Sequence, residues 1–295
     1  VSGQFFKLLM TRWLCIMNMS NKFELEGGGS MRLGCNVRDA GQAEVVIQHN
    51  MDYIEMNLCR LMEMPEEDFA AFAARIEDAP IKIEVFNLLL PLDGSIPIVG
   101  ENVSEIQYRK YFSRAFPRAA KMGAKLMVFG SARARAVPEG YPQEKARAQL
   151  VTFLRCLMEY AEQYDITVVI EPVCSREVEN DTIKTVPDAV KLAKEVAHPM
   201  LFALCDYYHM YYENEPMSDI VQAGSWIRHA HISCADEARS YPALDDGFEY
   251  APFFGALRKI GYDGRLSLEC FDMNIDKGIT QSMPVFKKFL YEEKI

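Results

Sequence analysis

From Met31 onward, short apolar runs alternate with longer segments in which apolar residues recur at helical spacing. Most of the runs are almost continuously apolar, as strands of a parallel sheet are when both faces are covered. Each run is short enough for one strand. The runs are MRLGCN (31–36), YIEMNL (53–58), IKIEVF (81–86), KLMVFG (125–130), ITVVIE (166–171), LFALCD (201–206), RHAHIS (228–233) and RLSLEC (265–270). The pattern predicts eight strands.

The segments between these runs carry the start signals of helices. PEEDFAAFAARIEDA (65–79) opens with proline and acidic residues, which helix N-termini favour. TVPDAVKLAKEVAH (185–198) places a threonine three residues before an aspartate, a variant of the capping box. PQEKARAQLVTFLRCLMEYAEQY (142–164) is amphipathic over its whole length. QSMPVFKKFLYEEK (281–294) is expected to form the last helix.

Alternation of eight strands with about as many helices over one domain is typical of an α/β fold, the closed (β/α)8 TIM barrel. The rival is an open, doubly wound sheet, which usually has a glycine-rich phosphate loop after its first strand. Here that position reads GCNVRDAG (34–41), which matches neither glycine-rich fingerprint. The sequence therefore favours the barrel.

The first thirty residues differ from the rest of the chain. Residues 1–19 are apolar but interrupted by Lys7 and Arg12, and LEGGGS (25–30) has the composition of a flexible linker. We expect residues 1–30 to be an N-terminal extension and residues 31–295 to form the barrel. A signal peptide remains an alternative for the apolar stretch, although a small-residue cleavage site is not evident.

Composition narrows the class of protein. A hydrophobic share of 49% with 25% charged residues is ordinary for a soluble enzyme. The chain has 42 acidic and 32 basic residues, and this net charge of −10 disfavours a nucleic-acid partner. Eight scattered cysteines without a CxxC pair predict buried free thiols and a cytoplasmic location. Neither composition nor patterning suggests a membrane partner.

Lone polar residues stand at the ends of four consecutive predicted strands. They are Glu171, Asp206, His231 and Glu269. Chemistry in such barrels gathers at the carboxyl ends of the strands, where these side chains would converge. Three carboxylates and an imidazole suit a divalent cation, Mn²⁺ or Mg²⁺ first, with Co²⁺ or Zn²⁺ as alternatives.

Each of these residues also has a purely structural interpretation. A carboxylate at a strand end often caps a helix or forms a surface ion pair. Strand alternation points His229 and His231 to the same face, so periodicity alone leaves the choice of ligand open. His209 lies on the loop after the sixth strand, within reach of a metal-bound substrate or on the surface.

Several motifs resemble the xylose-isomerase-like sugar isomerases and epimerases, including the ketose 3-epimerases. VIEPV (169–173), DYYHM (206–210), HAHIS (229–233), RSYP (239–242) and LSLEC (266–270) appear in the family's order. FGSARARAVPEGY (129–141) resembles a loop after the fourth strand in many members. The resemblance spans Met31 to the C-terminus.

The resemblance implies roles for individual residues. Glu171, Asp206, His231 and Glu269 match the family's four metal ligands, and Glu171 with Glu269 would also be its acid–base pair. Glu177, His209 and Arg239 match the residues that hold substrate oxygens. The implied activity is a metal-dependent isomerisation or epimerisation of a sugar or related polyol-ketone through an enediolate. Homo-oligomers are plausible for such barrels.

Three alternatives to a sugar epimerase stay open. The aromatic substrate clamp of the epimerases is not recognisable in GCNVRDAG, so a lyase or dehydratase acting on an inosose, a dehydroshikimate-like acid or a 3-keto glycoside is a candidate. A non-catalytic sugar-binding subunit is another. Apurinic endonucleases share the fold, but the acidic charge and only five histidines disfavour them.

Further polar residues are candidates for the pocket. Asn36, Glu55 and Asn87 lie near the ends of early strands, where they could line the pocket or brace the barrel mouth. Arg133 and Arg135 could meet a substrate phosphate or carboxylate, or form a solvated loop face.

Overall fold

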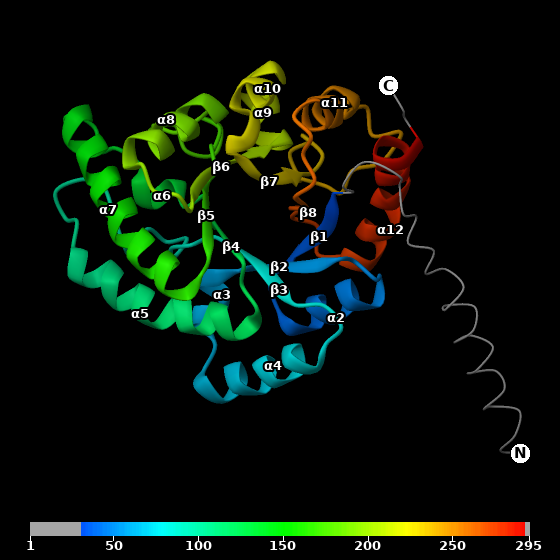
Figure 1. Ribbon diagram of the computed structural model, residues 1–295, viewed down its shortest axis with the longest axis horizontal. Coiled ribbons are helices and arrows are strands. Elements are labelled where there is room, and N and C mark those ends of the chain that lie inside the picture. Colours follow the sequence, from blue (N-terminus) through cyan, green and yellow to red (C-terminus); the bar gives the residue numbers. More distant parts are fainter. Residues whose placement is uncertain (1–30, 293–295) are drawn as a thin grey trace, which may run out of the picture. The chain divides into compact units, whose positions relative to one another are not determined.

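The protein is described by a computed structural model over residues 31–292 (Figure 1). Its eight strands form a closed barrel in sequence order, each parallel to the next and β8 pairing back to β1, so the predicted TIM barrel is confirmed. The strands are β1 (Arg32–Val37), β2 (Tyr53–Asn57), β3 (Ile83–Asn87), β4 (Leu126–Phe129), β5 (Thr167–Ile170), β6 (Leu201–Asp206), β7 (Ile227–Ile232) and β8 (Arg265–Leu268). The predicted extension over residues 1–30 lies outside the described residues.

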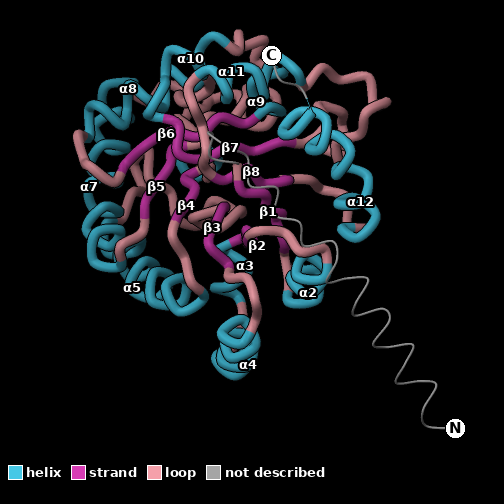
Figure 2. The backbone as a smooth tube through the Cα atoms, turned by 45° about the vertical axis from the view of Figure 1, so that its right-hand side comes forward, coloured by secondary structure: helices cyan, strands magenta, loops and turns pink. Residues whose placement is uncertain are grey.

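Helices surround the barrel as an outer ring (Figure 2). The longer ones are α2 (Ala40–Gln48), α4 (Glu66–Asp78), α5 (Glu105–Met122), α7 (Gln143–Tyr164), α8 (Val186–Val196), α11 (Ala251–Lys259) and α12 (Ile275–Phe286). Short helices sit in several of the loops: α3 (Leu58–Glu63), α6 (Ala132–Arg135), α9 (Tyr207–Tyr212), α10 (Ser218–Ala223) and η1 (Gly224–Trp226). A π-helical turn, η2 (Lys287–Glu292), follows α12.

Strand alternation separates two apolar layers. In β5, Val168 and Ile170 belong to the large core between the strands and the helices, whereas Val169 belongs to a small cluster inside the barrel. Because successive side chains point to opposite faces, Glu171 has the same orientation as Val169 and reaches the barrel mouth. Leu204 lies in the same inner cluster and precedes Asp206 by two residues, so β6 delivers its carboxylate in the same way.

Capping explains where the helices begin. Thr185 and Asp188 form the predicted capping box at α8. Pro65 lies immediately before α4, whose first turn is acidic, as the sequence predicts. Ser104 accepts a hydrogen bond from Gln107 N and starts α5.

The predicted start of the last helix at Gln281 is wrong. The helix begins at Ile275, where the side chain of Asn274 caps the N–H of Lys277. Gly278 lies inside this helix. A glycine is needed there because the Tyr241 ring occupies the space of a Cβ. The glycine marks close packing here.

The cysteines and the apolar character of the helices are also defined for the described residues. All seven cysteines among them are buried free thiols. None of the helices in residues 31–292 has the length and apolar character required to cross a bilayer.

Candidate active site

The four strand-end side chains come together at the barrel mouth. Carboxylate oxygens of Glu171, Asp206 and Glu269 and a ring nitrogen of His231 all lie within 4.8 Å of one another, and all four residues are buried. Nδ1 of His231 is central: it lies 3.0 Å from Glu171 Oε1 and 3.2 Å from Glu269 Oε2. Asp206 Oδ2 is 4.0 Å from the same nitrogen.

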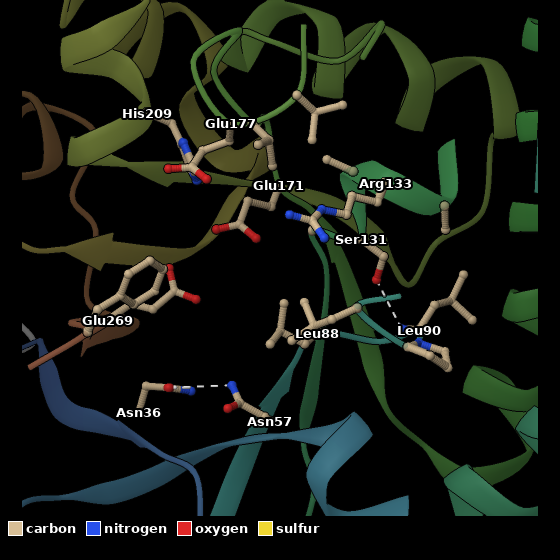
Figure 3. A pocket seen from close by; sticks show the side chains of 18 of the residues that line it. Asn36, Asn57, Leu88, Leu90, Ser131, Arg133, Glu171, Glu177, His209 and Glu269 are labelled. Atoms are coloured by element: carbon tan, nitrogen blue, oxygen red, sulfur yellow. Dashed lines mark hydrogen bonds between the residues drawn. The ribbon is translucent and has the colours of Figure 1, made fainter. Parts of the chain in front are cut away.

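A cavity of about 550 Å³ opens above these residues. Figure 3 shows Glu171, His209 and Glu269 directed into it from different sides. Glu177 and Arg239 also line the cavity, so it includes all three residues predicted to hold substrate oxygens. The volume is within the usual range for small-molecule sites.

The α9 segment positions His209. Asp206 caps this short helix by accepting a hydrogen bond from Tyr208 N, which places His209 one turn above the strand end. His209 Nε2 lies 3.6 Å from Asp206 Oδ2, and its Nδ1 accepts a hydrogen bond from Cys174 N at 3.3 Å. Tyr208 donates its hydroxyl to Glu177 Oε1 at 3.1 Å. One helical turn therefore organises both His209 and Glu177.

Arg239 lies against the carboxylates of the cluster. Its Nη2 is 2.5 Å from Asp206 Oδ2 and 2.6 Å from Glu269 Oε2, and the side chain is buried. Its backbone adopts φ +50°, in the left-handed region that is strained for a residue with a side chain. Strain of this kind is commonly found at functional sites.

A buried layer beneath the cluster orients His231. Glu55, from β2, lies with Oε1 3.0 Å from His231 Nε2 and Oε2 2.9 Å from His229 Nε2. Ser267 donates a third hydrogen bond to Glu55 Oε2 at 2.5 Å. The structure thus separates the two histidines: Nδ1 of His231 faces the strand-end carboxylates, while His229 pairs with Glu55.

Amides brace Glu269 from the other side. Asn87 Nδ2 donates to Glu269 Oε1 at 2.7 Å, and Asn57 Nδ2 donates to Asn87 Oδ1 at 2.6 Å. Asn36 lies 3.4 Å from Asn57 in the same chain of contacts. Of the early-strand candidates, Asn36 lines the cavity, Asn87 contacts Glu269, and Glu55 lies in the layer below. Asn57 is not among the residues predicted from the sequence, although it too ends an apolar strand, β2.

The loop after β4 fixes Glu171. At Gly130 an added Cβ would fall on Glu171 Oε2, so only glycine leaves the carboxylate its present position. Arg135 is fully buried, donates to Glu171 O at 2.8 Å, and forms an ion pair with Asp181 at 2.7 Å. Arg135 is therefore structural, and only Arg133 of the predicted pair lines the cavity.

Burial and neighbouring charges shift the ionisation of the cluster. Burial, reinforced by the Glu269 charge, raises the pKa of Glu171 to about 7. Burial alone would also raise the pKa of Glu269, but His231 and Arg239 outweigh it, so that pKa falls well below the usual range. Burial lowers the pKa of His209 to about 4, although the charge of Asp206 opposes this shift. The lowered pKa favours a neutral imidazole.

The donor set fits a divalent metal ion. Three buried carboxylates within 4.8 Å of one another require positive charge, and Arg239 supplies only part of it. Carboxylate oxygens with one imidazole nitrogen suit hard-to-borderline divalent cations. Glu55, His229 and His231 form a second geometrically suitable group, but these residues already pair with one another.

The closed (β/α)8 barrel with this cluster at the carboxyl ends of its strands is typical of barrel enzymes, and comparison with known families identifies the family. Residues 43–289 match the model of the xylose isomerase-like TIM barrel family, and the chain belongs to that family. The resemblance inferred from the motifs is therefore confirmed.

Particular relatives are ketose 3-epimerases. The chain is 26% identical over 155 residues to an L-ribulose 3-epimerase of Methylomonas sp. (strain DH-1), a match covering 52% of each protein. The aligned stretch thus spans about half the length of this curated relative.

Solved structures show the same fold. A D-allulose 3-epimerase from Methylomonas sp. superposes with a TM-score of 0.73 at 19% identity, covering 89% of this chain and 99% of that one. A D-psicose 3-epimerase studied in the presence of D-fructose gives a TM-score of 0.73 at 17% identity, covering 89% and 100%.

Proposed function

We propose that this protein is a divalent-metal-dependent isomerase or epimerase that moves a carbon-bound proton on a sugar or related polyol-ketone. The observation that carries the proposal is the convergence of Glu171, Asp206, His231 and Glu269 within 4.8 Å at the base of a cavity. Family membership and the similarity to ketose 3-epimerases support it.

Glu171, Asp206, His231 and Glu269 would hold the ion, and their oxygen-rich set favours Mn²⁺, with Mg²⁺, Co²⁺ or Zn²⁺ as alternatives. A bound divalent ion supplies Lewis-acid polarisation of a substrate carbonyl and charge for a developing enediolate.

Glu171 and Glu269 would be the acid–base pair. They directly follow β5 and β8, with β6 and β7 between these strands, and both line the cavity. One carboxylate would take the carbon-bound proton and the other would return a proton to the opposite face of the carbon. Arg239 would keep Glu269 in place, since its guanidinium already contacts that carboxylate.

His209 and Glu177 would bind substrate oxygens. His209 Nε2 lies beside Asp206, and a neutral imidazole could donate to or accept from a hydroxyl. Glu177 is exposed at the cavity wall and offers a carboxylate to a hydroxyl. We expect such contacts to orient the substrate for proton transfer.

Elimination by a lyase or dehydratase is a second candidate on the same scaffold. The end of β1 and the residue after it bring Asn36 and Arg38 to the cavity, where the clamp of the epimerases would need an aromatic ring. The same enediolate could lose a neighbouring hydroxyl, so an inosose, a dehydroshikimate-like acid or a 3-keto glycoside could be the substrate.

Product analysis separates these functions. Metal-loaded protein would be incubated with ketoses, inososes and 3-keto glycosides and the products identified by NMR. An epimer or aldose, absent with Glu269→Gln, supports the proposal, whereas an unsaturated product supports elimination. Tight sugar binding without any product would instead indicate a non-catalytic sugar-binding subunit.

Partners and location are proposed on chemical grounds. A net charge of −10 supports a small-molecule substrate and no nucleic acid or membrane partner. The buried free thiols of the described residues support a cytoplasmic location. A homo-oligomer remains a prediction that sedimentation analysis would test.

A further inference from the structure

Three arginines line the outer part of the cavity and take no part in the proposed metal set. Arg38 follows β1, Arg60 lies in α3 after β2, and Arg133 lies in α6 after β4. They come from three different loops, yet they meet at one cavity. The chain as a whole has ten more acidic than basic residues, so this gathering runs against its overall charge.

Arg133 is available for a ligand. Figure 3 shows its side chain reaching from α6 into the cavity, with the guanidinium directed toward Glu171. Within residues 31–292 its guanidinium has no hydrogen bond, ion pair or ring contact. Its neighbour Arg135, by contrast, is buried and paired with Asp181.

Arg38 and Arg60 are only weakly engaged. Arg38 donates to Met273 Sδ at 2.7 Å and lies 5.6 Å from the centre of the Phe271 ring, with no carboxylate partner among the described residues. Arg60 pairs with Glu63 at 2.8 Å, but both side chains are at least half exposed. Exposed ion pairs of this kind contribute little to stability, so little free energy opposes a new partner for Arg60.

The carboxylates of the cavity do not neutralise these charges. Glu171 and Glu269 belong to the proposed metal set, and Arg239 already contacts Asp206 and Glu269. The remaining carboxylate of the lining is that of Glu177. The outer cavity therefore has three guanidinium groups and one carboxylate. A cleft lined mainly by positive charge has a positive electrostatic potential that attracts anionic ligands.

We propose that the substrate carries an anionic group, a phosphate or a carboxylate, bound by Arg133 together with Arg38 and Arg60. The keto end would then face Glu171 and Glu269. Guanidinium groups bind both kinds of anion through paired hydrogen bonds, which neutral hydroxyls cannot match in strength. This inference rests on the proposed function for the orientation of the substrate, while the anion site itself rests on the arginines.

Calorimetry on the metal-loaded protein tests the anion site directly. The probes are D-fructose, D-allulose and L-ribulose, each beside its terminal phosphate, and D-fructuronate as the carboxylate counterpart of fructose. We expect at least one anionic probe to bind about ten- to a hundredfold more tightly than its neutral partner, the range for a charge-assisted hydrogen bond. Preference for the phosphates or for the uronate identifies the group.

Two variants assign the preference to the cavity. Arg133→Met should remove most of the preference for the anion, and Arg133→Lys should restore part of it because charge returns without the paired donors. Arg155→Met is the matched control, since Arg155 is exposed on α7 and does not line the cavity. It should bind all probes as the wild type does.

Deuterium incorporation from D₂O in the same samples separates this inference from the proposed function. Equal binding of anionic and neutral probes, binding of none, or an anion preference that survives Arg133→Met would overturn the anion site. Incorporation into a neutral ketose would still support the proposed function in that case. Conversely, an Arg133-dependent preference without incorporation into any probe supports the anion site and counts against the proton transfer.

Discussion

At the scale of single residues, Gly130 determines where the Glu171 carboxylate lies. A Cβ at this position would overlap Glu171 Oε2, so Gly130→Ala should displace the carboxylate from the cluster. We expect affinity for Mn²⁺ to fall by about tenfold or more, as losses of ligand support commonly do. Calorimetric titration would measure it. Gly255→Ala is the control, because a Cβ there meets nothing within 4 Å. Equal affinities in both variants would show that Glu171 does not depend on Gly130.

Glu55 is expected to fix the orientation of the His231 ring so that Nδ1 faces the metal ion. Its Oε1 lies 3.0 Å from His231 Nε2, on the side of the ring away from the carboxylate cluster. Glu55→Gln weakens this contact at nearly constant volume, so Mn²⁺ affinity should fall about ten- to a hundredfold.

Glu215→Gln provides a matched control for that variant. Glu215 is also a buried glutamate, but it accepts a hydrogen bond from Val186 N, away from the cluster. Its substitution should leave Mn²⁺ affinity unchanged. Wild-type affinity in a folded Glu55→Gln protein, checked by circular dichroism, would contradict the positioning role.

Strand alternation predicts which side chains converge at the barrel mouth, whereas contacts across the barrel cannot be predicted from it. The strand ends alone pointed to Glu171 and Asp206, and the structure brings them together with their partners. The choice between His229 and His231 required Glu55, which reaches them from β2. The contact of Glu55 with these histidines cannot be predicted from sequence, because the tilt and stagger of the strands determine which interior residues are neighbours.

At the scale of elements, the pair Arg135–Asp181 ties the loop after β4 to the segment between β5 and α8. Both side chains are fully buried, and Arg135 also donates to Phe129 O and Glu171 O. Asp181→Ala would leave a buried guanidinium without its partner, so the free energy of unfolding should fall by about 3–5 kcal/mol. Urea denaturation would measure the loss.

A surface pair gives the comparison for that experiment. Arg109 and Glu159 lie 2.7 Å apart, with exposed fractions of 35% and 61%. Glu159→Ala should therefore cost no more than about 1 kcal/mol. Similar losses in the two variants would mean that the buried pair has no special structural role.

The elements themselves were largely readable from the sequence. Each of the eight apolar runs overlaps a strand. The strands are recognisable because both of their faces are covered, which makes their sequences almost continuously apolar. The sequence predicts a last helix from Gln281, whereas α12 begins at Ile275 and includes Gly278, which packs against Tyr241. A packing requirement of this kind is invisible without the partner that lies 37 positions earlier in the chain.

At the scale of the whole molecule, Glu215 should make stability depend on pH. Burial raises the pKa of this carboxyl to about 8, with Asp219 and Asp188 adding to the shift against the hydrogen bond from Val186 N. In the unfolded chain the pKa of a glutamate side chain is about 4.3. Its contribution to stability is thus complete below that value and is lost as pH rises through about 8.

Glu215→Gln, which stays neutral, should remove this loss. The free energy of unfolding of the variant relative to wild type should increase steadily between about pH 5 and pH 8. Urea denaturation across this range would measure it, with Glu162→Gln, exposed on α7, as the control. A difference that stays constant with pH would refute the assignment to Glu215.

Function at this scale was predictable only in part. Motifs at the strand ends indicated the family, which the match over residues 43–289 confirms. The proposed anion site could not be predicted as a whole, because Arg38, Arg60 and Arg133 lie on separate loops and line one cavity only in the folded barrel. Of these three, only Arg133 is a candidate for binding a phosphate or carboxylate from its own stretch of sequence.

The most direct test of the central claim is solvent-deuterium exchange into a keto substrate by metal-loaded and metal-stripped protein. The account predicts incorporation at one carbon beside the carbonyl with Mn²⁺ present, none after chelation, and recovery when Mn²⁺ returns. It also predicts loss in Glu269→Gln, with Glu162→Gln unaffected. Exchange that persists without metal, or that survives Glu269→Gln, would contradict a metal-dependent proton transfer at this cluster.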